Sequence, residues 1–566
     1  MPDSASFDPR PRAGLSHVVG DTRPVLWRKT IGQLLSETAA RFPDNDAMVF
    51  CAQNLRFTYR ELEAEVDALA AGLHRLGLRA GERIGIWSPN RPEWVLIQFA
   101  SAKLGLILVN INPAYRLSEL EYALNKVGCT AIVIADRFKS SDYIAMIREL
   151  APEIDGAEPG ALQSKTLPEL RLVIAMGAGK IAGMMNFDDI AIRGEHDVDI
   201  AAIGASLDPG DAINIQFTSG TTGTPKGATL THFNIVNNGR FVVRAMKFTD
   251  QDRLCIPVPM YHCFGMVMGA LGCVSVGACM VFPSEAFDPL ETLQALDAER
   301  CTAAYGVPTM FIAMVEHPEF KRFDYSAMRT GCMAGAPCPA EYMKRVMSEL
   351  NMSGVTSACG MTETSPVSMQ CDVDDPVQMR VETVGRIQPH AEIKVVDQDG
   401  NIVPVGEMGE ICTRGYLVMQ GYWNDEARTR ETIGDDGFLH SGDLATIDAD
   451  GYIRIVGRLK EMLIRGGENI YPREIEEFLY RLPKIQDVQI FGVPDEKYGE
   501  VVCAWIILKE GQDASAQDIK DFCHGQIAHF KIPLHIRFVD EMPMTVTGKL
   551  QKFKMREAMV EELGLA

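Results

Sequence analysis

The first half of the chain alternates between segments with helical spacing of apolar residues and short, continuous apolar runs. A capping box at Thr58-Tyr-Arg-Glu61 opens an apolar-periodic segment that extends to about Leu76 and predicts a helix. The run Arg83 to Trp87 predicts a buried strand, and a helix-like segment at 117–126 precedes a strand-like segment at 130–136. This alternation indicates layered α/β sheets with largely parallel strands.

Beyond about Pro389 the pattern changes to shorter units separated by turns. Residues 392–397 and 409–414 have the alternation of a hairpin, and a strand is predicted at 452–456. From about Lys460 the pattern predicts a helix, two strands and a helix capped by Ser515. We therefore expect a large body at 1–458, which includes a β-rich subdomain, and a small α+β C-terminal domain at 459–566.

Composition and charge favour a soluble enzyme with several domains. The 566 residues are 46% hydrophobic and 23% charged, and the formal net charge is −21. Such a field repels a polyanion, so we expect no nucleic-acid partner, whereas local backbone donors can still hold a small phosphate ligand. The 14 cysteines show no zinc-ligand spacing, and they predict buried apolar positions in a reducing compartment, the cytoplasm.

One apolar segment tests the expectation that the chain has no transmembrane span. Residues 264–282 carry no charge, but they contain four glycines and lack a basic flank, so we expect a buried core helix. The N-terminus has neither the basic nor the apolar region of a signal peptide.

A loop rich in Gly and Thr is the strongest local signal. It follows the strand-like run 212–217 and precedes a helix predicted to begin near Thr231. Glycines let backbone N–H groups approach an anion, the hydroxyls add donors, and the lysine adds the charge that a triphosphate needs. The alternative is a mobile linker, and a P-loop is excluded because the lysine is not followed by Ser or Thr. The loop consists of Thr218, Ser219, Gly220, Thr221, Thr222, Gly223, Thr224, Pro225, Lys226 and Gly227.

The loop and five further motifs resemble the superfamily of acyl- and aryl-CoA synthetases, adenylation domains and firefly luciferase. They follow in the order of that family and span most of the chain: Pro259–Gly265, Gly360–Thr364, Ser441–Asp443, Gly457–Lys460 and Thr547–Lys549. The tail segments at 465–472, 529–533 and 548–556 resemble medium-chain fatty acyl-CoA synthetases.

The resemblance implies that a carboxylate attacks the α-phosphorus of ATP and that CoA then displaces AMP. Two anions meet in the first step, so the site needs fixed positive charge more than acid–base groups. Lys549 is implied to supply this charge, Glu363 to hold Mg²⁺ and Thr362 to donate to phosphate. Without the motif, Lys549 would be a solvated lysine and Glu363 an acid at the start of a helix.

The resemblance also implies where the nucleotide binds. Asp443 and Arg458 are implied to contact the ribose, although an Asx-turn is the alternative for Asp443. The two walls of the adenine slot are implied to be Gly335, Ala336 and Pro337 on one side and Ala358, Cys359, Gly360 and Met361 on the other. Many relatives carry an aromatic residue where this chain has Cys359. The loss of one stacking face on adenine is expected to weaken ATP binding by roughly 1 kcal/mol or more.

In the family, the C-terminal domain rotates between the two steps, so this domain is expected to be mobile. Lys460 occupies the hinge position, and Gly466 and Gly467 are implied to line the CoA channel. The residues implied to border the acyl site are His262, Phe264, Tyr305, Gly306 and Met333, for which core packing is the alternative.

Taken together, the sequence predicts an AMP-forming ligase that joins a medium-chain or similar apolar acid to CoA. The alternatives are a CoA ligase for an aryl or heteroatom-containing short acid, and a module that loads a carrier-protein thiol. A homodimer is the default expectation for the assembly.

Overall fold

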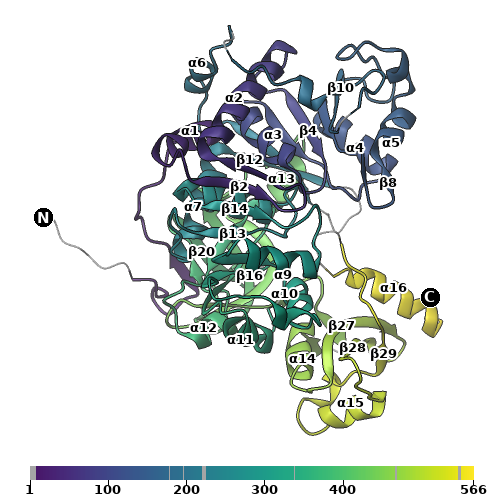
Figure 1. Cartoon of the computed structure of the whole chain (residues 1–566). Coiled ribbons are helices and arrows are strands. Elements are labelled where there is room, and N and C mark those ends of the chain that lie inside the picture. Colours follow the sequence, from purple (N-terminus) through teal and green to yellow (C-terminus); the bar gives the residue numbers. More distant parts are fainter. Residues whose placement is uncertain are drawn as a thin grey trace, which may run out of the picture.

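The computed structural model describes residues 8–177, 179–194, 197–218, 225–336, 338–465, 468–545 and 550–565. Figure 1 shows a large body, with the C-terminal elements α14 to α16 and β27 to β29 in a smaller lobe beside it. None of the helices in the described part of the chain combines the length and apolar character that a membrane span needs.

The first large sheet has eight strands, of which the six from β10 to β11 are parallel. Their order is β10 (Met185–Asn186), β9 (Leu172–Ala175), β6 (Cys129–Ile134), β4 (Arg83–Trp87), β5 (Ile107–Asn110), β11 (Ala212–Thr218), β12 (Lys226–Thr231) and β22 (Gly421–Tyr422). The strand expected at Arg83 to Trp87 is therefore confirmed.

The second large sheet has nine strands, with six parallel strands in the centre and antiparallel strands at both edges. Their order is β19 (Arg386–Ile387), β18 (Val367–Gln370), β17 (Gly354–Gly360), β16 (Thr330–Ala334), β15 (Ala303–Gly306), β13 (Arg253–Cys255), β14 (Cys279–Phe282), β2 (Asp46–Phe50) and β3 (Leu55–Thr58). One apolar cluster draws side chains from both large sheets, so the two share a core.

The β-rich subdomain is a five-stranded antiparallel sheet, as the change of pattern near Pro389 indicates. Its strands are β1 (His17–Val19), β20 (Ala391–Val396), β21 (Gly409–Gly415), β23 (Leu439–Ile447) and β24 (Ile453–Arg458). A short hairpin elsewhere in the body pairs β7 (Arg137–Phe138) with β8 (Ser141–Asp142).

The C-terminal lobe has a sheet of its own. It contains β26 (Glu468–Ile470), β25 (Leu463–Arg465), β28 (Gly499–Leu508), β27 (Ile485–Asp495) and β29 (His535–Phe538), together with α14 (Pro472–Leu479), α15 (Ala516–Cys523) and α16 (Lys552–Leu563). The cap expected at Ser515 is present, since its side chain accepts from the N–H of Asp518. Two apolar clusters within the lobe use only residues from Leu463 onward.

Helices cover the sheets of the body, and their starts follow the capping rules. Thr58 caps α2 with the expected capping box, in which the side chain of Glu61 accepts a hydrogen bond from the backbone N–H of Thr58. The helices of the body are α1 (Ile31–Arg41), α2 (Tyr59–Arg75), α3 (Pro92–Lys103), α4 (Leu117–Val127), α5 (Tyr143–Leu150), α6 (Ile200–Ala205), α7 (His232–Ala245), α8 (Gly272–Val276), α9 (Pro289–Ala298), α10 (Pro308–Val315), α11 (Ala340–Glu349), α12 (Val377–Glu382) and α13 (Glu426–Thr432).

The expectation of a single core helix at 264–282 is wrong. The segment is a π-helix, η3 (Phe264–Leu271), followed by α8 and then by β14. The helix ends because Gly277 adopts a left-handed conformation with φ of 82°. Its burial is as expected: every residue of η3 is buried.

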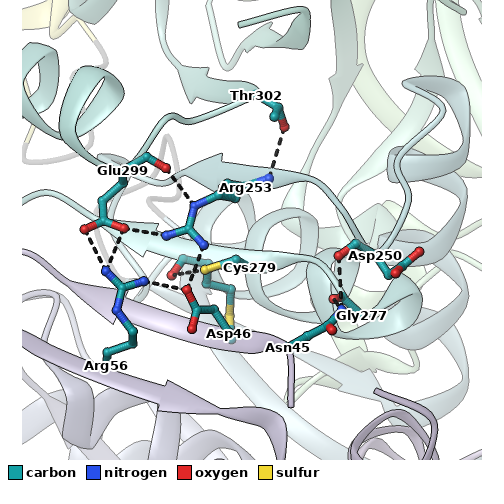
Figure 2. Close-up of polar contacts among 10 residues, drawn as sticks. Asn45, Asp46, Arg56, Asp250, Arg253, Gly277, Cys279, Glu299 and Thr302 are labelled. Carbon is teal, nitrogen blue, oxygen red and sulfur yellow. Dashed lines mark hydrogen bonds and ion pairs between the residues drawn. The ribbon is translucent and has the colours of Figure 1, made fainter. Parts of the chain in front are cut away.

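An ion-pair network ties the edge of the nine-stranded sheet to the end of α9 (Figure 2). Arg56 donates to both carboxylate oxygens of Glu299 at 2.9 Å, and Arg253 donates to Asp46 at 2.8 Å and also contacts Glu299. Burial alone would raise the pKa of Asp46, but hydrogen bonds from Arg253 and Arg56 outweigh it and lower the pKa.

We expect Asp46→Asn to lower the free energy of unfolding by about 1–3 kcal/mol at pH 7, because two guanidinium groups lose their charged acceptor. A lowered pKa means that this contribution is complete above the unfolded-state value of about 3.9 and is lost as the pH falls through the folded-state value. Urea unfolding at pH 7 and at pH 3 measures both effects. Asp44→Asn, which breaks only the exposed pair with Arg60, is the control, and an equal loss in both variants at pH 7 would contradict the prediction.

Candidate functional site

The candidate site lies where the carboxyl ends of strands from the two large sheets meet. Strand β11 ends at Thr218, while β17 ends at Gly360 and continues into the short 3-10 helix η5 (Thr362–Thr364). The hydroxyl of Thr218 donates to Oε1 of Glu363 over 3.1 Å and thereby connects the two sheets. Carboxyl ends of parallel strands are where α/β proteins bind ligands, so this junction is the expected place for a site.

The carboxylate of Glu363 is buried and held by two hydroxyl groups. Besides Thr218, Tyr422 donates to Oε1 at 2.9 Å, and burial and the nearby carboxylate raise the pKa of Tyr422, so the phenol stays a donor. The ammonium of Lys226 lies 4.9 Å from the centre of the Tyr422 ring. Within the described residues, Oε2 of Glu363 has no hydrogen-bond donor and can act as an oxygen ligand.

The Gly- and Thr-rich loop lies between two strands, whereas we expected it to lie between a strand and a helix. Thr218 and Lys226 are antiparallel partners, so the loop joins β11 to β12. Helix α7 begins at His232 after the N-cap Thr231, as expected, but a strand that we did not predict separates it from the loop. No helix N-terminus follows the loop directly, because the pairing of β12 with β11 decides the conformation of these residues.

Ten expected site residues lie outside the described residues. They are Ser219, Gly220, Thr221, Thr222, Gly223, Thr224, Pro337, Gly466, Gly467 and Lys549.

The segments expected to form the adenine slot leave adjacent strands. Because β16 and β17 are parallel neighbours, residues 335–336, which follow β16, and residues 359–361, at the end of β17, lie at the same edge of the sheet. Gly335 has φ of 89°, a conformation that favours glycine. A Cβ at Gly360 would lie 1.9 Å from the backbone oxygen of Pro366, so only glycine fits there.

The structure brings together Cys359 and the two residues expected to contact the ribose. Asp443 and Arg458 are cross-strand partners, and Arg458 Nε donates to Asp443 Oδ1 at 3.1 Å. Burial, together with a smaller contribution from the charge of Asp443, raises the pKa of Cys359 to about 12. The thiol is therefore neutral at physiological pH. The turn before Asp443 is closed by Ser441, whose Oγ accepts a hydrogen bond from the Asp443 N–H at 3.0 Å. The acceptor in this turn is therefore the hydroxyl of Ser441 and not the carboxylate of Asp443.

Four of the five residues expected at the acyl site lie in one region. The rings of Phe264 and Tyr305 are 5.3 Å apart, and Nδ1 of His262 accepts from the N–H of Phe264 at 3.2 Å. Gly306 follows Tyr305 on β15. Met333 is the exception, because its side chain belongs to a different apolar cluster from that of Tyr305, whereas its neighbour Cys332 shares the Tyr305 cluster. Alternation along β16 thus points Met333 away from Tyr305.

The described residues on either side of the C-terminal motif pair with each other. Met544 and Leu550 pair as an antiparallel bridge, and the N–H of Gln551 donates to the oxygen of Pro543 at 2.8 Å. Lys460 is exposed in the turn after β24.

Two residues near the site were not predicted from the sequence. Tyr422 supports Glu363, and Glu410 accepts at Oε1 from the backbone N–H of Gly442, beside Asp443, at 2.9 Å. No local pattern could have indicated them, because each acts on a partner 32 or more positions away in the sequence.

Comparison with known proteins decides the family. Residues 35–423 match the AMP-binding enzyme model, and residues 474–549 match the C-terminal domain of AMP-binding enzymes. The chain belongs to the AMP-binding enzyme family. It is an acyl-CoA synthetase of the adenylate-forming superfamily by sequence likeness, and the co-substrates of such enzymes are ATP and CoA.

Relatives of this AMP-binding enzyme match it over nearly their whole length. The protein YngI of Bacillus subtilis (strain 168) is 48% identical over 544 residues, which is 96% of this chain and 99% of YngI. The medium-chain acyl-CoA ligase ACSF2, mitochondrial, of Homo sapiens is 44% identical over 98% of this chain and 91% of its own length. A solved structure of the anthranilate CoA ligase AuaEII with anthranoyl-AMP has a TM-score of 0.81 at 26% identity, covering 94% of this chain and 98% of that one.

We expect Cys359→Tyr to lower the KM for ATP roughly fivefold, because an aromatic ring adds a stacking face worth about 1 kcal/mol. Initial rates at varied ATP measure the change. Cys359→Ala, which removes the thiol without adding a ring, should stay within about twofold of the parent. An unchanged or higher KM in a folded Cys359→Tyr enzyme would refute the assigned slot.

Proposed function

We propose that this AMP-binding enzyme is an ATP-dependent acid–thiol ligase that converts a medium-chain or similar apolar carboxylic acid into its acyl-CoA, with AMP and pyrophosphate as products. The observation that carries the proposal is the convergence of Thr218, Glu363 and Tyr422 at the junction of the two sheets, with Lys226 beside them. Relatives named medium-chain acyl-CoA ligases, 44% identical over almost the whole chain, support the choice of acid.

In the first step, a carboxylate oxygen of the acid forms a bond to the α-phosphorus of ATP. The bond from that phosphorus to the bridging oxygen breaks, and pyrophosphate leaves with the electron pair. Both reactants are anions, so the main task of the site is to offset charge at fixed positions. We assign this task to Lys226, to the Gly/Thr loop and to Lys549.

Glu363 fits a role as a ligand of Mg²⁺. Its carboxylate is buried, one oxygen is fixed by two hydroxyl donors, and a hard cation prefers carboxylate oxygen. When bound, Mg²⁺ would neutralise charge on the phosphates, while Thr218 and Tyr422 hold the carboxylate in place.

In the second step, the sulfur of CoA forms a bond to the acyl carbon, the bond from that carbon to the oxygen of AMP breaks, and the thiol proton is released. We propose that the lobe at 459–566 turns about Lys460 between the steps. One orientation would present Lys549 and the other would present Gly466 and Gly467, which leave room for the pantetheine arm. The apolar clusters confined to residues from Leu463 onward support a lobe that moves as one unit.

The proposed binding region for the acyl chain is the wall formed by Phe264 and Tyr305, where His262 accepts a hydrogen bond from the backbone N–H of Phe264. The likeness to the anthranilate CoA ligase AuaEII supports an aryl acid as the second candidate substrate. We also propose that the enzyme is a homodimer and that it acts in the cytoplasm, a reducing compartment that suits its 14 free cysteines.

Lys549→Ala tests the two-orientation mechanism. We expect at least a hundredfold loss of adenylate formation, measured as acid-dependent pyrophosphate release, because a charge that acts on the transition state is removed. Thioester formation from a supplied acyl-adenylate should remain close to the parent rate. Lys554→Ala, at an exposed position of α16, is the matched control, and equal loss in both half-reactions would defeat the mechanism.

A panel of acids tests the proposed substrate. We expect kcat/KM for CoA-dependent turnover to be highest between hexanoate and decanoate, because each buried methylene adds about 0.8 kcal/mol until the pocket is full. Benzoate and anthranilate represent the aryl alternative, and a purified carrier protein in place of CoA represents the other. Faster turnover of an aryl acid, or transfer to the carrier in preference to CoA, would overturn the assignment.

A further inference from the structure

Three side chains of metal-ligand type meet on one face of the five-stranded sheet, beside the turn that carries Asp443. Glu410 and Cys412 are two positions apart on β21, so they share a face, and His440 on β23 is the cross-strand partner of Cys412. Their ligand atoms all lie within 4.8 Å of one another. Among the described residues, no other group of three or more such side chains comes this close.

The distances between these atoms are close to those around a tetrahedral zinc ion. Cys412 Sγ lies 3.4 Å from His440 Nδ1, and Glu410 Oε2 lies 2.9 Å from the same nitrogen. With metal–sulfur bonds of about 2.3 Å and metal–nitrogen or metal–oxygen bonds of about 2.0–2.2 Å, ligands of one tetrahedral ion are about 3.3–3.6 Å apart. The third pair, Glu410 Oε2 and Cys412 Sγ, lies within 4.8 Å, so movement of these two side chains toward each other would let all three atoms contact one ion.

We propose that Glu410, Cys412 and His440 bind a thiophilic divalent cation of the Zn²⁺ class. A thiolate, an imidazole and a carboxylate together favour zinc over Mg²⁺, which prefers oxygen ligands alone. The ion replaces the proton of the Cys412 thiol, which is released to solvent, and binds the neutral imidazole of His440 through Nδ1. Solvent reaches the group through His440 and Glu410, whose side chains are 40% and 22% exposed, and a water molecule completes the coordination.

This cation site is coupled to the nucleotide through the second oxygen of Glu410. Oε1 accepts from the backbone N–H of Gly442 at 2.9 Å, next to Asp443, and Ser441 Oγ donates to the oxygen of Ile411. A cation on the carboxylate withdraws charge from the bond to Gly442 and loosens the turn that presents Asp443. Bound zinc therefore weakens ATP binding, a consequence that depends on the proposed function.

Cobalt binding tests the site without relying on activity. Full-length protein, freed of metal with a chelator, is titrated with Co²⁺, and the near-ultraviolet charge-transfer band reports a cobalt–thiolate bond. We expect one equivalent to produce the band, Zn²⁺ to abolish it by displacement, and Cys412→Ser to lack it. Cys51→Ser, at a half-buried cysteine outside the group, is the matched control and should retain the band.

A second variant keeps the test decisive if the buried position of Cys412 tolerates no change. His440→Gln alters a partly exposed side chain and should weaken cobalt binding by more than about 100-fold, since it removes a direct ligand. The absence of a band in the parent would overturn the proposal, as would a band of equal affinity in Cys412→Ser or His440→Gln.

The coupling is measured separately as KM for ATP in zinc-loaded protein from which excess metal has been removed. We expect a roughly fivefold increase in the parent and no change in Cys412→Ser treated in the same way. An unchanged KM in a parent that binds cobalt would disprove the coupling. A protein that binds cobalt but turns over no acid would contradict the proposed function and leave the cation site intact.

Discussion

The hydrogen bonds that meet on the carboxylate of Glu363 join the two large sheets at the point where the reaction is proposed to occur. Thr218 reaches it from the end of β11 and Tyr422 from β22, both in the eight-stranded sheet, while Glu363 itself follows β17 of the nine-stranded sheet. A buried carboxylate costs free energy unless donors hold it, so these partners stabilise both the junction and the charge. Any ligand placed by Glu363 is thereby placed relative to both sheets.

The same junction shows how an acidic protein can handle anions. The formal net charge is −21, yet ATP, the acid and CoA are all negatively charged. Within a few ångströms, however, Lys226 and the hydroxyls at this edge outweigh a distant field that salt screens. Local donors at strand ends can therefore favour small anions despite the negative net charge.

In the proposed mechanism, the β-rich subdomain links the nucleotide to the lobe at 459–566. It supplies Asp443 and Arg458 from adjacent strands, and the hinge position at Lys460 follows Arg458 by two residues. Glu410 on the neighbouring strand accepts a hydrogen bond from the backbone N–H of Gly442, and this hydrogen bond stabilises the turn that carries Asp443. A group that alters this carboxylate would act on the proposed ribose contact without touching the nucleotide.

Sequence patterns that span only a few residues were enough to predict individual helices and strands. The capping box at Thr58 and the strand at Arg83–Trp87 form as predicted, because hydrogen bonds and apolar spacing within a few residues decide them. The ordered motifs were likewise sufficient to indicate the family, whereas the residues of the nucleotide site stay a prediction.

Only the tertiary structure decided the features that depend on distant partners. Strand β12 exists because it pairs with β11, the core segment bends at Gly277 to place β14 in the sheet, and Met333 packs away from Tyr305 because of alternation along β16. The group of Glu410, Cys412 and His440 is the clearest case. Its cysteine and histidine are 28 positions apart with no zinc-like spacing, and they meet only because cross-strand register sets them side by side.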